Sequence, residues 1–199
     1  MPKPRRSGFR IGTVHGKSNP RKRKSEAQLQ RDVFLRGSLA LIKSSEKSKQ
    51  EIVRIVGYEV PLSSAKRSGS IDLVGYDRHH RLYLIELKRG KSTEKIAQIV
   101  AQLQRYDQQF ATIRDGFVEE LKTAYHFDFV PKDKVQLMIL APREFWTRQE
   151  KNIPVAQHAG IDCTYFRIKD VKTLRSGHGP VSVHFRKFKL SAATRRHKR

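Results

Sequence analysis

The spacing of apolar residues predicts three helical segments. The first begins after Ser25, a suitable N-cap followed by Glu26 in the first turn, and Gly37 is expected to end or bend it. Its buried face is predicted from residues at helical spacing: Leu29, Val33, Phe34, Ala40 and Leu41. A second helix with an apolar stripe is expected over about 92–117, and a shorter helical piece at 144–159.

Apolar runs, several of them alternating with polar residues, predict six strands. These are Val53–Leu62, Ser70–Tyr76, Arg81–Lys88, Val135–Ala141, Cys163–Ile168 and Val181–Phe188. The second and third are separated only by the turn at 77–80, which favours a β-hairpin. The fourth is typical of a central buried strand, and the last is expected at a sheet edge. The order of elements therefore predicts an α/β fold in which helices flank an open, mixed central sheet.

Basic residues are concentrated at the two ends of the chain. Residues 1–24 contain nine Lys or Arg and residues 186–199 contain seven, and neither segment contains Asp or Glu. Segments of this composition bury little apolar surface, so we expect two flexible basic arms around one globular domain at 25–185. The formal net charge of +23 restricts the expected partners to polyanions, and above all to nucleic acid.

Other features narrow the class of protein. No apolar run reaches the length of a membrane-spanning helix, and neither arm has the amphipathic period of a membrane-surface helix. Cys163 is the only cysteine and lies in an apolar run, so a buried structural thiol is expected rather than a nucleophile. We expect a cytoplasmic, nucleoid-associated protein that binds DNA, or alternatively RNA, and no membrane.

Charged residues occur inside two of the most apolar strands. Alternation places Glu86 and Lys88 on the same face of the strand Arg81–Lys88, and both faces begin apolar, so both are expected to be covered. Asp72 lies in the partner strand of the predicted hairpin, near the Glu86 end. Two carboxylates and one ammonium are therefore expected to converge in an enclosed pocket, where unpaired charges are costly.

Two interpretations of this pocket stay open. In the first, Lys88 forms a buried ion pair with Asp72 or Glu86 and the group has no chemical role. In the second, the two like-charged carboxylates hold a cation, and oxygen ligands without His or Cys suit Mg²⁺ or Mn²⁺. Together with a basic chain, the second interpretation predicts phosphodiester hydrolysis, in which Lys88 orients or helps to deprotonate the attacking water.

The same residues resemble the PD-(D/E)xK nuclease superfamily. Asp72 within Gly69–Val74, followed by Glu86-Leu87-Lys88, is similar to the motif of RecB-like and NucS (EndoMS)-type endonucleases. Gln102 and Tyr106 follow in the order and at the i,i+4 spacing of the Gln-x-x-x-Tyr motif of those enzymes. The resemblance covers about residues 25–170 and implies a restriction-endonuclease-like αβββαβ core.

The resemblance also implies roles for individual residues. Asp72 and Glu86 would bind the metal ion, with the carbonyl of Leu87 as a third protein ligand. Gln102 and Tyr106 would support the site. Glu26 resembles an additional acidic residue that many members place on the first helix, although a favourable interaction with the helix dipole explains it nearly as well.

Several basic residues lie in loops beside the predicted site. Lys66 and Arg67 precede the Asp72 strand, and Arg89 and Lys91 follow the Glu86 strand; all four are candidates to hold DNA phosphates, or are simply solvated surface charges. Glu59, on the preceding strand, either reaches the site or faces solvent. A homodimer is expected if both strands of a duplex are cut together.

The sequence thus predicts a Mg²⁺-dependent DNA endonuclease or exonuclease that acts on structured or damaged DNA in repair, recombination or defence. Two alternatives compete with this hypothesis. A catalytically silent nucleic-acid-binding protein with a nuclease-like fold would explain the charge but has no need for buried carboxylates, which repel phosphate. A basic RNA- or ribosome-associated protein would explain the arms but leaves the same carboxylates unexplained.

Overall fold

The computed structural model describes residues 8–9, 11–12, 25–42, 50–63, 69–166 and 179–185. Within these residues the helices are α1 (Glu26–Arg36), α2 (Ile96–Ala111), α3 (Arg114–Tyr125), α4 (Arg143–Arg148) and α5 (Ile153–His158). The strands are β1 (Ser38–Ile42), β2 (Glu51–Pro61), β3 (Ser70–Asp77), β4 (Leu82–Leu87), β5 (Gln136–Pro142), β6 (Ile161–Phe166) and β7 (Val181–Phe185). The C-terminal arm and most of the N-terminal arm lie outside the described residues.

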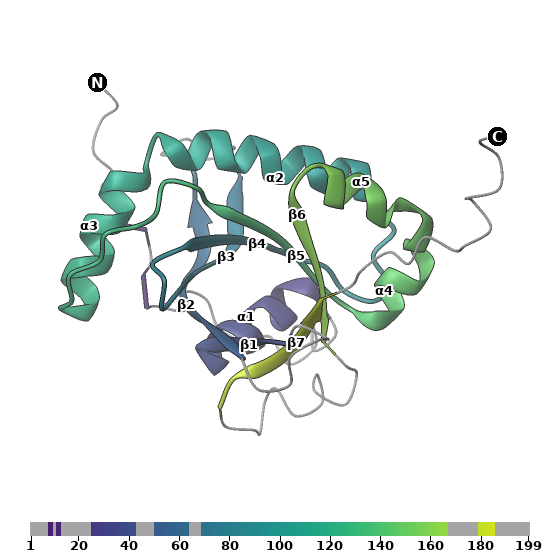
Figure 1. Ribbon diagram of the computed structural model, residues 1–199, viewed down its shortest axis with the longest axis horizontal. Coiled ribbons are helices and arrows are strands. Elements are labelled where there is room, and N and C mark those ends of the chain that lie inside the picture. The colour runs from purple at the N-terminus through teal and green to yellow at the C-terminus, as the bar shows by residue number, and fades with distance from the viewer. Residues whose placement is uncertain are drawn as a thin grey trace, which may run out of the picture.

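The seven strands form a closed mixed barrel in the order β1-β2-β3-β4-β5-β6-β7. Strands β1, β2, β3 and β4 pair in sequence order, each antiparallel to the next. The pairs β4–β5 and β5–β6 are parallel. β7 pairs antiparallel with β6 and parallel with β1, which closes the sheet. Figure 1 shows α2 along the upper side of β4 and β5, and α1 below these strands in the same region of the view as β1 and β7.

The prediction of an open central sheet with a restriction-endonuclease-like core is therefore wrong, and so is the prediction that the last strand is an edge. The cause is the segment after α1. Gly37 adopts a left-handed conformation with φ 70° and its N–H donates to Phe34 O, which ends the helix. The next residues form β1, including Ala40 and Leu41, which the helical spacing had assigned to α1. β1 pairs with both β2 and β7, so the strand that the helical spacing missed is the one that closes the barrel.

The barrel interior is filled by an apolar group that we call the interior cluster. Every strand and α1 contribute to it, including Phe34, Leu41, Ile85, Met138 and Val183. A second apolar group, the outer cluster, packs α2, α3, α4 and α5 against the outer faces of β2 to β6. The covering of β4 on both faces is confirmed, because Leu84 belongs to the outer cluster and Ile85 to the interior cluster.

This arrangement determines where the charged residues of β4 point. Glu86 is two positions from Leu84 and so shares the face that looks towards α2, and that helix packs on β4 through the outer cluster.

Burial of Cys163 on β6 is also confirmed, and burial raises the pKa of its thiol to about 12. Across the described ranges, no helix is both long and apolar enough to cross a membrane.

The packing of the interior cluster predicts a large effect of Leu41→Ala. Leu41 is 1% exposed, and truncation should lower the free energy of unfolding by about 3 kcal/mol because it leaves a cavity. Leu35→Ala is the matched control, since Leu35 is 61% exposed and its loss should cost less than about 0.5 kcal/mol. Urea denaturation measures both values, and equal small losses would contradict a packed interior.

Candidate active site

The hairpin of β3 and β4 brings the predicted carboxylates together. Leu73 pairs with Ile85, so the next residues along the two strands, Asp72 and Glu86, lie opposite each other. Asp72 Oδ2 accepts a hydrogen bond of 2.8 Å from the N–H of Leu87. The predicted convergence of Asp72 with the Glu86-Leu87-Lys88 segment is confirmed.

Lys88 lies at the centre of a group of carboxylates. Its side chain is 6% exposed, and Nζ lies 2.7 Å from Glu86 Oε1 and 2.8 Å from Glu94 Oε2. A third carboxylate, Glu26 of α1, lies 3.8 Å from the same nitrogen and also accepts from the N–H of Arg89 at 3.1 Å. The structure therefore places Glu26 beside Lys88, which is one of the two possibilities that the sequence left open, and one ammonium faces several negative charges.

Helix α2 supplies the amide and hydroxyl groups of the site. Gln102 Nε2 lies 3.0 Å from Glu86 Oε1 and 2.8 Å from the hydroxyl of Tyr106, one helical turn further on. Gly69 precedes β3 and has φ 78°. It packs closely against Tyr106: a Cβ at this position would lie only 3.3 Å from the Tyr106 hydroxyl. The predicted pair Gln102 and Tyr106 thus contacts the carboxylate of β4, and Tyr106 also packs against the start of the Asp72 strand.

Burial and neighbouring charges raise the pKa values of the two hairpin carboxylates, Asp72 and Glu86. The pKa of Asp72 is raised well above its usual range, first by burial and then by the charge of Glu86, although Leu87 N–H and Lys88 oppose this shift. Burial also raises the pKa of Glu86 against the lowering effect of Lys88. For Lys88, burial lowers the pKa, but the carboxylates, Glu86 foremost, shift it upward overall. Lys88 therefore stays charged and interacts with several neighbouring carboxylates at once.

Glu94 is the site residue that sequence reasoning missed. In the sequence it lies near the start of the helix expected over about 92–117, with no assigned role, yet α2 begins at Ile96 with Lys95 as its N-cap. Glu94 lies in the preceding loop, and this loop turns its carboxylate back to Lys88. No pattern in the sequence marks this contact, because it depends on how the loop folds.

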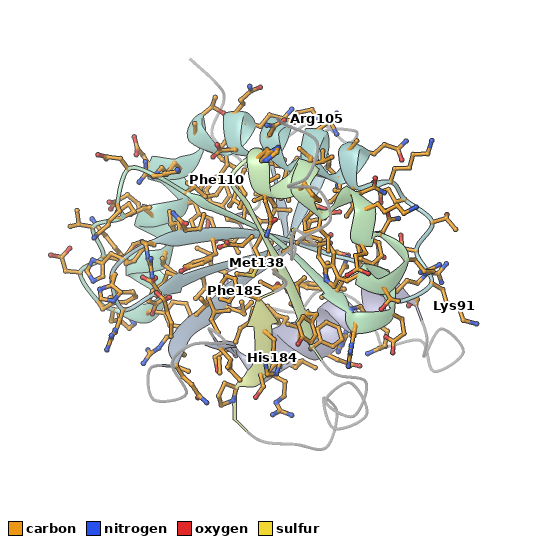
Figure 2. The ribbon with its side chains drawn as sticks, turned by 45° about the vertical axis from the view of Figure 1, so that its right-hand side comes forward. Lys91, Arg105, Phe110, Met138, His184 and Phe185 are labelled. Carbon is orange, nitrogen blue, oxygen red and sulfur yellow. The ribbon has the colours of Figure 1, made fainter. Side chains whose placement is uncertain are left out.

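The remaining candidates are less closely associated with the site. Lys66 and Arg67 lie outside the described residues. Arg89 and Lys91 are exposed in the turn after β4, and Figure 2 shows Lys91 projecting from the molecular surface. Their contact with phosphate, and coordination by the Leu87 carbonyl, stay predictions.

Glu59 is engaged elsewhere. It lies on β2 beside Tyr58, which pairs with Leu73, the residue after Asp72. Its backbone has φ 46°, a region rarely adopted by Glu. Burial, and then the charge of the Glu59 carboxylate, raises the pKa of the Tyr58 hydroxyl to about 12. We therefore leave Glu59 out of the candidate site.

The donor groups present fit a hard divalent cation. Glu86 Oε2 is buried and has no hydrogen-bond partner among the described residues, while Oε1 accepts from both Lys88 and Gln102. A buried carboxylate oxygen in this state gains from a cation. Among the described residues, however, no three His, Cys, Asp or Glu side chains are arranged to hold one metal ion. The fitting set is therefore Asp72, Glu86 and a backbone carbonyl, completed by water, as Mg²⁺ commonly requires.

Comparison with known proteins adds no identification. No protein-family model, curated protein or solved structure matches the chain. The function is therefore inferred from the residues of the site and their geometry.

The repulsion between Asp72 and Glu86 predicts that Asp72→Asn stabilises the metal-free protein. Asn keeps an acceptor for the Leu87 N–H and removes one like charge, so the melting temperature in EDTA should rise by about 2–4 °C, which corresponds to about 1 kcal/mol. Asp128→Asn is the control, because Asp128 is exposed and its neighbours Phe127 and Phe129 pack on Tyr76, at the opposite end of β3 from Asp72. An equal effect of both substitutions would contradict the assigned repulsion.

The same shift predicts a pH dependence. A raised carboxyl pKa means that the folded state binds a proton more tightly than the unfolded chain, so stability falls as pH rises from the ordinary carboxyl range through the raised value. Urea denaturation of the metal-free protein at about pH 5 and about pH 8 should show a smaller loss of stability for Asp72→Asn than for the wild type. Identical losses in the two proteins would show that Asp72 does not titrate in this interval.

Proposed function

We propose that the protein is a divalent-metal-dependent nuclease that hydrolyses DNA phosphodiester bonds. The observation that carries the proposal is the convergence of Asp72 with the buried residues Glu86 and Lys88. A purely structural ion pair needs one carboxylate for one ammonium. Here the second carboxylate faces the first with its pKa raised, and one oxygen of Glu86 has no partner among the described groups. Such excess negative charge is unfavourable for folding and suited to a cation.

Asp72 and Glu86 are the residues that would hold the metal, with the Leu87 carbonyl as the third protein donor. When bound, Mg²⁺ or Mn²⁺ lowers the pKa of a water molecule and stabilises negative charge on the phosphate during cleavage. The hydrogen bond from Leu87 N–H fixes Asp72 Oδ2, which leaves Oδ1 available. Gln102 anchors Glu86 through Oε1, which leaves Oε2 available in the same way.

Lys88 provides the positive charge of the site. Its ammonium is held against Glu86 and is shielded from solvent, and its pKa is shifted upward overall, so it remains protonated near neutral pH. A protonated lysine orients the attacking water and stabilises negative charge on the phosphate, and it does not act as the base. Gln102 and Tyr106 restrict the positions of Glu86 and of the chain before Asp72.

The distribution of charge supports a polyanionic substrate. The chain carries a formal net charge of +23, and the exposed residues Arg89 and Lys91 directly follow Lys88. Cations at these positions can bind phosphates on either side of the scissile bond without reading the base sequence. Binding should therefore weaken steeply with salt.

Cleavage assays test the proposal. Linear, nicked, branched and single-stranded DNA are incubated with Mg²⁺ or Mn²⁺, and the wild type is expected to cleave at least one of them. Lys88→Ala and Glu86→Gln should each reduce the rate about 100-fold or more, because each removes a group that acts on the reacting phosphate. Lys134→Ala, at an exposed position away from the pocket, should cleave like the wild type.

Two controls make the assay decisive. Melting temperatures of all variants verify that each is folded, and EDTA must abolish cleavage. Cleavage that persists in EDTA or in Lys88→Ala would overturn the mechanism. Absence of cleavage on every DNA substrate, together with salt-sensitive DNA binding, would instead favour a catalytically silent nucleic-acid-binding protein.

A further inference from the structure

Two carboxylates of different origin lie within hydrogen-bonding distance of the Lys88 ammonium, whereas Glu26 is further away at 3.8 Å. Glu86 lies on β4, two residues before Lys88, and its Oε1 lies 2.7 Å from Nζ. Glu94 comes from the loop before α2, and its Oε2 lies 2.8 Å from the same nitrogen. Both distances are those of charge-assisted hydrogen bonds. Either carboxylate alone could therefore keep the ammonium in place.

The loop that carries Glu94 is fixed at several points. The N–H of Glu94 donates to Ser92 Oγ at 3.4 Å, and its carbonyl accepts from Gln149 Nε2 at 3.2 Å. Arg148, at the end of α4, donates to the carbonyls of Gly90 and Ser92. Contacts on both sides of the Glu94 peptide restrict its backbone, so the side chain is directed to Lys88 by a preformed loop.

The two carboxylates are not equivalent in the proposed enzyme. Glu86 is a proposed metal ligand, and a cation bound to it would neutralise the charge that attracts Lys88. Glu94 belongs to a separate loop and is not part of the proposed donor set. A lysine side chain has large rotational freedom, so losing its main partner would release the ammonium unless a second one remains.

We propose that Glu94 is a positioning residue that keeps the Lys88 ammonium at the site when Glu86 is committed to a cation. This inference deepens the proposed function and rests on it for the role of Glu86. The contact between Glu94 and Lys88 can nevertheless be tested without metal or DNA, because Glu86→Gln imitates the neutralised carboxylate while keeping its shape.

The test is nitrogen-15 NMR of the lysine ammonium groups in metal-free protein. A buried, hydrogen-bonded ammonium exchanges its protons slowly enough to give a cross-peak, and the peak of Lys88 is assigned by its loss in Lys88→Arg. The peak should persist in Glu86→Gln, held by Glu94, and should disappear in the double variant Glu86→Gln/Glu94→Gln. Glu86→Gln/Glu144→Gln is the matched control, because Glu144 lies beside Gly90 at the same loop, and it should keep the peak.

Each result decides the proposal. Loss of the peak in Glu86→Gln alone would show that Glu94 does not hold Lys88. Persistence in Glu86→Gln/Glu94→Gln would show that other groups hold it, and loss in the Glu144 control would point to a general effect of charge. Any of these would overturn the proposal, and melting temperatures verify that all variants are folded.

Kinetics separate this inference from the proposed function. Glu94→Gln should lower kcat about tenfold or more while the KM for DNA stays within about twofold, and Glu94→Asp should recover part of the loss. The affinity for Mn²⁺, measured by calorimetry, should fall in Glu86→Gln but not in Glu94→Gln. If Mn²⁺ affinity falls equally in both, Glu94 is a metal ligand and the inference is wrong. If the wild type neither binds Mn²⁺ nor cleaves DNA, the proposed function fails, and the NMR comparison still decides whether Glu94 holds Lys88.

Discussion

The antiparallel register between β3 and β4 is the constraint on which the site depends. Pairing of Leu73 with Ile85 puts Asp72 opposite Glu86 and brings its carboxylate to the backbone of Leu87. A shift of β4 by one residue would exchange its two faces and send Glu86 into the apolar barrel interior. Because both faces of β4 are buried, each with its own apolar cluster, such a shift is strongly unfavourable. The packing of the barrel thus enforces the geometry of the charged group.

The charged group in turn opposes folding. Asp72 and Glu86 have raised pKa values, and Lys88 is one ammonium shared among Glu86, Glu94 and Glu26. Burial of the two apolar clusters on either side of β4 provides the folding free energy that offsets this unfavourable charge. This relation, in which functional groups reduce the stability that packing provides, is common at active sites. It is also the physical reason to assign a chemical role to the group, since a folded state gains nothing from its excess negative charge.

The features that could be predicted from the sequence are those determined by residues close together along the chain. Ser25 caps α1 with an acceptor for the Gln28 N–H, as its residue type and position indicate. The hairpin follows from two apolar runs and a short turn, and it alone brings Asp72 to Glu86. Gln102 lies on the face of α2 that meets Glu86, one helical turn before Tyr106. None of these features depends on how the rest of the sheet is completed.

The features that could not be predicted depend on contacts between distant segments. The barrel closes through β1 and β7, where Leu39 pairs with Val181, and local periodicity contains no information about such a pairing. Glu94 reaches Lys88 only because Arg148 and Gln149, far along the chain, hold its loop. Closure involves the first and last strands, whereas most of the candidate site is built from one continuous segment, from β3 through α2. That separation explains how the predicted architecture can be wrong while the predicted grouping of the hairpin residues is correct: the pairing of β3 with β4 alone brings Asp72 to Glu86 and Leu87.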